Sequence, residues 1–116
     1  PTPDGTPVRD YIHISDLANI VSTVLLTSAN PDVEILNVSR GTGFSLLEIV
    51  KTIELKLNKN LKYNFDKHNK NESSTSLLNP SKLNQTYFVS HKLGLDEIID
   101  SQIEFYKNLK QTHFED

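Results

Sequence analysis

The dipeptide Asp4-Gly5, followed by the extended-looking segment 8–14, constrains the fold more than any other feature of this sequence. Glycine accepts positive φ without a steric penalty and aspartate tolerates it, so the pair is typical of a tight turn. The apolar and aromatic residues that follow favour a strand. We expect the chain to open inside a hairpin. Because it has no initiating methionine, we also expect it to be a piece of a longer protein.

Two helices are expected in the first half of the chain. The first begins at a cap supplied by Ser15 or Asp16 and ends before Pro31. The second follows a capping box in which Ser45 bonds forward and Glu48 bonds back. Both have apolar residues at helical spacing. These are Leu17, Val21, Val24 and Leu25 in the first helix, and Leu47, Val50, Ile53 or Glu54, and Leu57 in the second.

Two more helices are expected in the second half. Asn79 caps a short helix from about Pro80 to Phe88, because proline at the first position loses no needed hydrogen bond. A final helix begins near Leu95 or Asp96. Its apolar stripe consists of Ile98, Ile99, Ile103, Tyr106 and Leu109.

Short apolar runs at 35–38 and 61–65 predict strands, and the polar segment 66–75 predicts an exposed loop. The expected fold class is therefore α+β, with about four helices and short strands in one domain of 116 residues. The net charge of -3 comes from 12 basic and 15 acidic residues mixed along the chain, which argues against nucleic acid as a partner. No apolar run reaches the roughly 20 residues of a membrane span. The absence of cysteine excludes disulfides and thiolate sites, and favours the cytoplasm.

The turn Gly41-Thr42-Gly43 lies between an expected strand and a helix, where phosphate-binding loops occur. The dinucleotide fingerprint needs a third glycine at the position of Leu46. We therefore interpret the two glycines as a sharp turn into a capped helix.

Two Tyr-x-x-x-Lys matches, Tyr63 with Lys67 and Tyr106 with Lys110, have the spacing of a catalytic pair. That chemistry requires both side chains on one helix face beside a nicotinamide. Because Tyr63 lies in an expected strand and Tyr106 in an apolar stripe, we expect neither pair to be catalytic.

The four histidines lack the spacing of metal ligands, so no metal site is expected. They are His13, His68, His91 and His113. For His13 a bonded position in the core is favoured over a role as a base. A mixed-charge loop contains Lys67, Lys70 and Glu72. Its composition favours neither a solvent-exposed loop nor a contact with a ligand over the other.

Arg9 stands in an apolar, aromatic segment, where a planar guanidinium is usually kept for a carboxylate or a phosphate. From residue types alone, the partner of Arg9 can equally be the carboxylate of Asp10 or Asp16 or the phosphate of a ligand.

Residues 4–17 resemble the signature Asp-Gly-Thr-x-x-Arg-Asp-Tyr-Ile-His-Val-x-Asp-Leu of the NAD-dependent epimerase/dehydratase family, the extended short-chain dehydrogenases/reductases. UDP-glucose 4-epimerases are the most similar members. Segment 36–48 resembles the family stretch Asn-Val-Gly-x-Gly-x-Gly-x-Ser-Val-x-Glu, and segment 79–82 resembles Asp-Pro-Ser-Lys. The resemblance covers nearly the full length, in family order and spacing. It is specific for the superfamily, not for one sugar.

The resemblance implies that residues 1–116 are the small C-terminal substrate-binding lobe of a longer enzyme, without its Rossmann domain. The parent would be an isomerase that inverts a sugar hydroxyl at C4 by transient oxidation with NAD. In such enzymes the NAD loop and the catalytic residues precede the Asp-Gly-Thr hairpin, so none is expected here. The alternatives are the substrate lobe of a nucleotide-sugar dehydratase or reductase, and a non-catalytic binding module.

The resemblance also implies a substrate site made of Arg9, Tyr11, Lys70 and Glu72. Arg9 would hold the diphosphate of a UDP-sugar, and Tyr11 would help form the same wall. The family's second phosphate arginine falls on Asn69, where it is missing. Lys70 would supply charge one position away, and Glu72 would replace the family's acid. Whether this loop binds phosphate stays open.

The implied partners are a nucleotide sugar and the Rossmann domain of the same protein, in a cytoplasmic homodimer of carbohydrate metabolism. The sequence leaves open which sugar and nucleotide are bound, and which of the related reactions the parent carries out.

Overall fold

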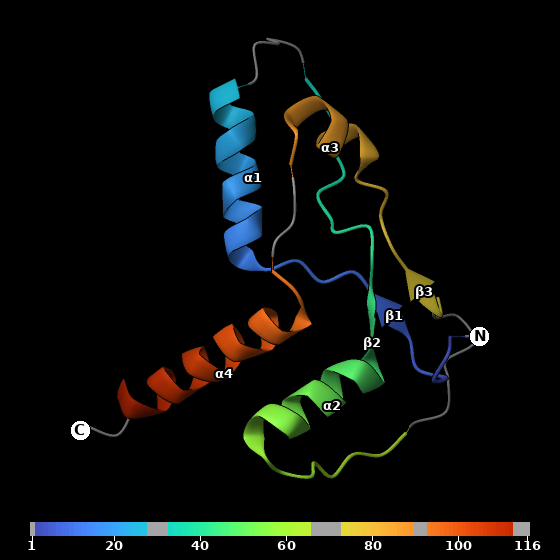
Figure 1. Cartoon of the computed structure of the whole chain (residues 1–116), viewed down its shortest axis with the longest axis vertical. Coiled ribbons are helices and arrows are strands. Elements are labelled where there is room, and N and C mark those ends of the chain that lie inside the picture. The colour runs from blue at the N-terminus through green and yellow to red at the C-terminus, as the bar shows by residue number, and fades with distance from the viewer. Residues whose placement is uncertain (1, 28–32, 66–72, 90–92, 113–116) are drawn as a thin grey trace.

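The computed structural model describes residues 2–27, 33–65, 73–89 and 93–112. Within these ranges four helices and a three-stranded sheet form the α+β fold that the sequence predicts (Figure 1). The strands are β1 (Val8–Arg9), β2 (Phe44–Ser45) and β3 (Thr75–Ser76). The helices are α1 (Ile14–Thr27), α2 (Leu46–Leu57), α3 (Ser81–Tyr87) and α4 (Leu95–Thr112).

Strand β1 is the centre of the sheet. It pairs antiparallel with β2 and parallel with β3, so three distant parts of the chain lie side by side. In this register Arg9 is opposite both Phe44 and Ser76. The strand predicted over 8–14 is wrong beyond Arg9, because the Asp10 side chain bonds to the backbone of another loop and α1 begins at Ile14.

The Asp4 turn joins the sheet to the start of α2. One oxygen of the Asp4 carboxylate accepts hydrogen bonds from the backbone N–H and the hydroxyl of Thr6, at 2.9 and 2.8 Å. Its other oxygen accepts a hydrogen bond from the hydroxyl of Ser45. Thr6 and Ser45 are both buried. The Asp4 carboxylate of this turn is therefore hydrogen-bonded to Ser45, the residue that precedes α2.

The predicted capping box of α2 is confirmed. The N–H of Glu48 donates to the Ser45 hydroxyl at 3.0 Å, and the N–H of Ser45 donates to the Glu48 carboxylate at 2.6 Å. The two N–H groups between them donate to the carbonyl oxygen of Pro7 and the hydroxyl of Thr6. The N–H groups that a helix start usually leaves unpaired therefore all have protein acceptors.

Helix α1 starts one residue earlier than the predicted caps. The ring nitrogen Nδ1 of His13 accepts the N–H of Ser15 at 3.0 Å, so His13 caps the helix and the prediction of Ser15 or Asp16 is wrong. Asp16 is buried and accepts the N–H of Leu93 instead. This hydrogen bond connects the first turn of α1 to the segment just before α4.

Helix α3 begins close to the predicted position. The Asn79 side chain accepts the N–H of Ser81 at 2.9 Å, while Pro80 occupies the cap position. Leu83 points into the core and is fully buried. The helix ends at Phe88, which has a left-handed backbone with φ of 52°.

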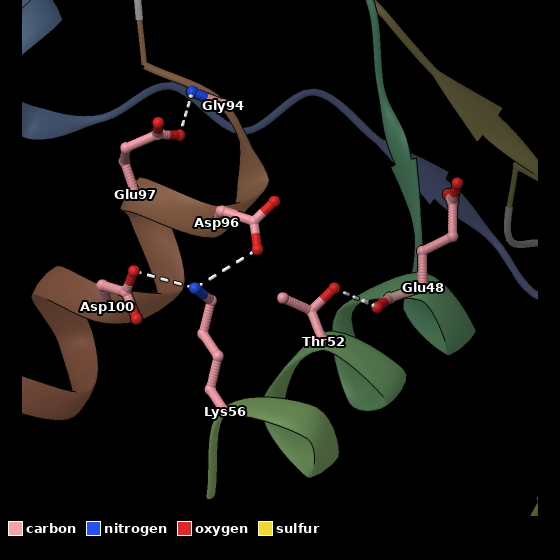
Figure 2. Close-up of polar contacts among 7 residues, drawn as sticks. All are labelled: Glu48, Thr52, Lys56, Gly94, Asp96, Glu97 and Asp100. Atoms are coloured by element: carbon pink, nitrogen blue, oxygen red, sulfur yellow. Dashed lines mark hydrogen bonds and ion pairs between the residues drawn. The ribbon is translucent and has the colours of Figure 1, made fainter.

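Helix α4 begins at Leu95, as predicted, and packs against α2. Figure 2 shows the polar contact between them, in which the Lys56 ammonium lies 3.2 Å from Asp96 and 2.8 Å from Asp100. The hydrogen bond to Asp100 raises the pKa of Lys56, with a smaller contribution from Asp96. At the start of α4, the carboxylate of Glu97 accepts the N–H of Gly94 (Figure 2).

The strands predicted at 35–38 and 61–65 do not form. Their backbone groups bond to side chains instead of to a neighbouring strand. The carbonyl oxygen of Ile35 accepts from the Lys82 ammonium, and the N–H of Leu61 donates to the Glu54 carboxylate. Neither segment therefore belongs to the sheet.

Three apolar side chains are buried among the described residues, namely Ile20, Leu83 and Ile99. Two of the apolar residues at helical spacing in α1, Val21 and Leu25, do not face the core, because they are 47% and 75% exposed. Helix α1 instead packs against α3 through the side that carries Ile20. None of the helices in the described ranges has the length and apolar character needed to cross a membrane.

Candidate functional site

The candidate site is the part of the sheet around Arg9. This arginine lies in the central strand, is half-buried, and donates from Nη1 to the carbonyl oxygen of Val8 at 2.9 Å. Tyr11 follows two residues later and is 36% exposed. The structure thus keeps both of these predicted residues together in one segment beside the sheet. The other two, Lys70 and Glu72, lie outside the described residues.

Both carboxylates considered as partners of Arg9 accept hydrogen bonds from backbone N–H groups. The two oxygens of Asp10 accept the backbone N–H groups of Arg40 and Gly41, each at 3.0 Å. Asp16 accepts the N–H of Leu93. The two interpretations of Arg9, an ion pair with one of these acids and a ligand phosphate, both stay predictions.

Two residues of this face were missed by reasoning from the sequence. Phe44 lies opposite Arg9 in the β1–β2 register, and cross-strand partners project from the same face of a sheet. The guanidinium of Arg40 lies 5.3 Å from the centre of the Phe44 ring. The available signal was that Arg40 is the second of two arginines in the chain and stands beside the glycine turn.

The glycine turn is a sharp turn into a capped helix, as interpreted from the sequence, and neighbouring side chains occupy the space beside its glycines. Gly41 has a positive φ of 74°, and a side chain on Gly43 would meet Leu77 at 2.6 Å and Val8 at 2.7 Å. Because the N–H groups at the start of α2 are already bonded, no cradle for a pyrophosphate is left. The residues present at this turn do not fit NAD.

The remaining candidates give no catalytic arrangement in the described part of the chain. His13 uses Nδ1 as a helix cap, and the other histidines and Lys67 are not described. Tyr106, predicted to lie in a buried stripe, is 62% exposed, so that prediction is wrong. No group of three or more His, Cys, Asp or Glu side chains that could hold a metal ion occurs in the described ranges.

Comparison with known proteins gives matches in sequence and in fold, although no family model matches. The chain is 38% identical over 101 residues to UDP-glucose 4-epimerase of Bacillus subtilis, across 84% of this chain and 29% of the relative. The structure of UDP-glucose 4-epimerase from Bifidobacterium longum in complex with NAD+ and UDP matches with a TM-score of 0.82 and 28% identity, over 92% of this chain and 32% of that one.

UDP-glucuronic acid 4-epimerase from Bacillus cereus, in complex with UDP-glucuronic acid and NAD, matches with a TM-score of 0.80 and 25% identity, over 91% of this chain and 34% of that one. These matches relate the chain to the NAD-dependent nucleotide-sugar epimerases and dehydratases, as its signature implies. Its sequence relatives within that class include UDP-glucose 4-epimerases, and it spans about 29% of the length of the Bacillus subtilis enzyme.

Proposed function

We propose that this chain is the nucleotide-sugar-binding lobe of an NAD-dependent epimerase of the UDP-glucose 4-epimerase type. The observation that carries the proposal is the position of Arg9 in the central strand of the sheet, paired on both sides and two residues before Tyr11. A guanidinium in this position can bond two oxygens of a diphosphate. Tyr11 would form the wall beside it. Lys70 and Glu72 belong to the same proposal as a second contact to the ligand.

The surface of the chain supports its being one lobe of a larger protein. Ile14, Val21 and Leu25 recur along α1 at the spacing of one helix face, and all three are exposed. A second apolar face on a helix favours burial against another domain, which we propose to be the dinucleotide-binding domain.

In the parent protein, NAD held by that domain would oxidise C4 of the sugar and return the hydride to the opposite face. Arg9 and Tyr11 would bind and orient the nucleotide end of the substrate. A dehydratase or reductase parent would use the same contacts, because they involve the nucleotide and not the sugar. We also propose that the parent protein is a homodimer located in the cytoplasm.

The first test is Arg9→Ala in the protein encoded by the complete reading frame. Titration calorimetry should show UDP-sugar binding weakened by about 1.5 to 3 kcal/mol, the contribution of hydrogen bonds to a charged group. Lys107→Ala, on α4, removes the same charge away from the sheet and should leave the affinity unchanged. Equal affinities for Arg9→Ala and the parent protein would remove Arg9 from the site.

The second test uses the 116-residue chain. We expect weak binding of UDP and no change of melting temperature with NAD, because the turn at Gly41 and Gly43 does not fit a dinucleotide. A clear stabilisation by NAD contradicts the lobe assignment. Reading the codons upstream of Pro1 should show a glycine-rich strand-turn-helix start and a Tyr-x-x-x-Lys helix. Their absence would favour a non-catalytic binding module.

A further inference from the structure

The backbone that carries Arg9 and Tyr11 leaves the sheet between these two residues, at Asp10. The pairing of β1 with β2 and with β3 ends at Arg9. Helix α1 begins only at Ile14, so Asp10 and Tyr11 belong to neither element. The direction of Tyr11 relative to Arg9 therefore depends on what holds Asp10.

The side chain of Asp10 bonds to the glycine turn. Its two carboxylate oxygens accept the backbone N–H groups of Arg40 and Gly41, each at 3.0 Å. Gly41 has a left-handed backbone with φ of 74°. Successive N–H groups in such a turn form a concave anion-binding site, called a nest. In this protein the nest is occupied by the carboxylate of Asp10.

The glycine turn is itself held in place by the segment before α3. A Cβ on Gly41 would lie 2.9 Å from Cδ of Pro80, so the turn packs closely against this proline. The buried hydroxyl of Ser39 donates to the carbonyl oxygen of Leu78 at 3.2 Å. The carboxylate of Asp10 thus connects the end of β1 to a turn that another part of the chain already fixes.

This connection controls the direction of the neighbouring side chains. Hydrogen bonds to an ionised group are stronger than neutral ones, and two of them from one carboxylate also fix its orientation. A guanidinium binds two phosphate oxygens only when its N–H groups point at both of them. Small displacements of positioning groups have large effects at such sites. Rotation of the backbone at Asp10 would therefore turn Arg9 and Tyr11 away from a shared ligand.

We propose that Asp10 is a positioning residue of the substrate site, which holds Arg9 and Tyr11 in the direction needed to bind a nucleoside diphosphate. This inference rests on the proposed function of the Arg9 site. The carboxylate of Asp10 bonds to the glycine turn and not to the ligand. Asp10 acts on the affinity through the backbone that it shares with its two neighbours.

The test is calorimetric titration of UDP into the protein encoded by the complete reading frame. In Asp10→Asn only one side-chain oxygen remains as an acceptor, and the amide N–H2 group faces the second backbone N–H. This variant should weaken UDP binding about tenfold, the loss of one charge-assisted hydrogen bond. Each variant is titrated well below its melting temperature, so that unfolding does not contribute to the measured affinity.

Ser39→Ala is the matched control. It removes the hydrogen bond to Leu78 from the same turn and leaves both bonds of Asp10 in place. We expect a lower melting temperature and an unchanged UDP affinity. If Ser39→Ala weakens UDP binding as much as Asp10→Asn does, any damage to the turn has this effect, and the positioning role is overturned.

A double-mutant cycle tests whether Asp10 acts through Arg9. In an Arg9→Ala background, Asp10→Asn should weaken UDP binding by about threefold at most, because only Tyr11 is left to position. The same loss in both backgrounds would show that Asp10 acts independently of Arg9, which contradicts the inference.

The outcomes distinguish this inference from the proposed function. If Arg9→Ala weakens UDP binding and Asp10→Asn does not, the inference fails while the Arg9 site stands. If Arg9→Ala leaves the affinity unchanged, both fail. If Asp10→Asn does not fold, Asp10→Glu keeps both acceptor oxygens on a side chain that is one methylene longer. It should still weaken UDP binding, because residues 9–11 shift relative to the turn, and an unchanged affinity would overturn the inference.

Discussion

The carboxylate of Asp4 accepts a hydrogen bond from the hydroxyl of Ser45, which ties the first turn of the chain to the start of α2. The same carboxylate holds Thr6, whose hydroxyl accepts the N–H of Leu47. The aspartate and threonine of the Asp-Gly-Thr signature therefore stabilise the fold, because their side chains hydrogen-bond to the start of α2. The arginine of the same signature lies in the sheet, where it can face a ligand. One short motif thus combines a structural anchor with the proposed phosphate contact.

The Asp4 anchor should make stability depend on acid pH. Hydrogen bonds from Ser45, and next from Thr6, hold the pKa of Asp4 below its ordinary value of 3.8. A lowered pKa in the folded state means that the stabilisation is complete above 3.8 and is lost as the pH falls through the lower, folded-state value. Asp4→Asn should lower the melting temperature at neutral pH and flatten its decline in acid.

Circular dichroism melts over an acid pH series would measure this difference. Glu104→Gln, an exposed position on α4, serves as the control and should follow the wild-type curve. Parallel curves for Asp4→Asn and the wild type would show that the anchor does not contribute to acid sensitivity.

Gly43 should tolerate no side chain. A Cβ there would lie 2.6 Å from the Leu77 side chain and 2.8 Å from the Arg9 carbonyl oxygen, and the backbone of a central strand cannot move away easily. We expect Gly43→Ala to destabilise the chain by about 1 to 3 kcal/mol, as overpacking does. Urea unfolding gives the free energy. Thr42→Ala, in the same turn but exposed, should stay within about 0.5 kcal/mol of wild type.

The features predicted correctly from the sequence depend on residues close together in the chain. The capping box of Ser45 and Glu48 spans one turn, and the start of α4 at Leu95 follows from a local change of pattern. The strand predicted at 35–38 failed because pairing needs a distant partner, and here side chains took its place. The starts of α2 and α4 were therefore predictable, whereas the cap of α1 and the strand pairing were not.

The candidate site was likewise predicted only where its residues are close together in the sequence. Arg9 and Tyr11 were found through a contiguous signature, whereas Arg40 joins them through β1–β2 pairing and a contact with Phe44. The helical spacing of apolar residues in α1 also did not show which side of the helix would be buried. Packing against α3 selected the face with Ile20, which left Val21 exposed. The proposed roles of Lys70 and Glu72 remain predictions.

Leu83 should be the most sensitive apolar position of α3. Its side chain is fully buried between the described elements, so truncation removes contacts and leaves a cavity. Leu83→Ala should cost about 2 to 5 kcal/mol of unfolding free energy. Leu26→Ala removes the same atoms from a side chain that is 85% exposed and should change stability by less than about 0.5 kcal/mol. Similar losses for the two variants would contradict the packing of α3 against α1.

Phe88 should be a site where glycine stabilises the chain. It has a left-handed backbone with φ of 52° and a side chain that is 89% exposed. For a residue with a β-carbon this conformation costs roughly 1 to 2 kcal/mol, and the exposed ring gains little from burial in return. Glycine removes the strain but loses more backbone freedom on folding, which offsets about 0.5 to 1 kcal/mol of the gain. Phe88→Gly should therefore raise the unfolding free energy by roughly 0.5 to 1 kcal/mol in urea titrations. Phe88→Ala keeps the β-carbon and should give no such gain, so equal stabilisation by both variants would assign the effect to loss of the ring.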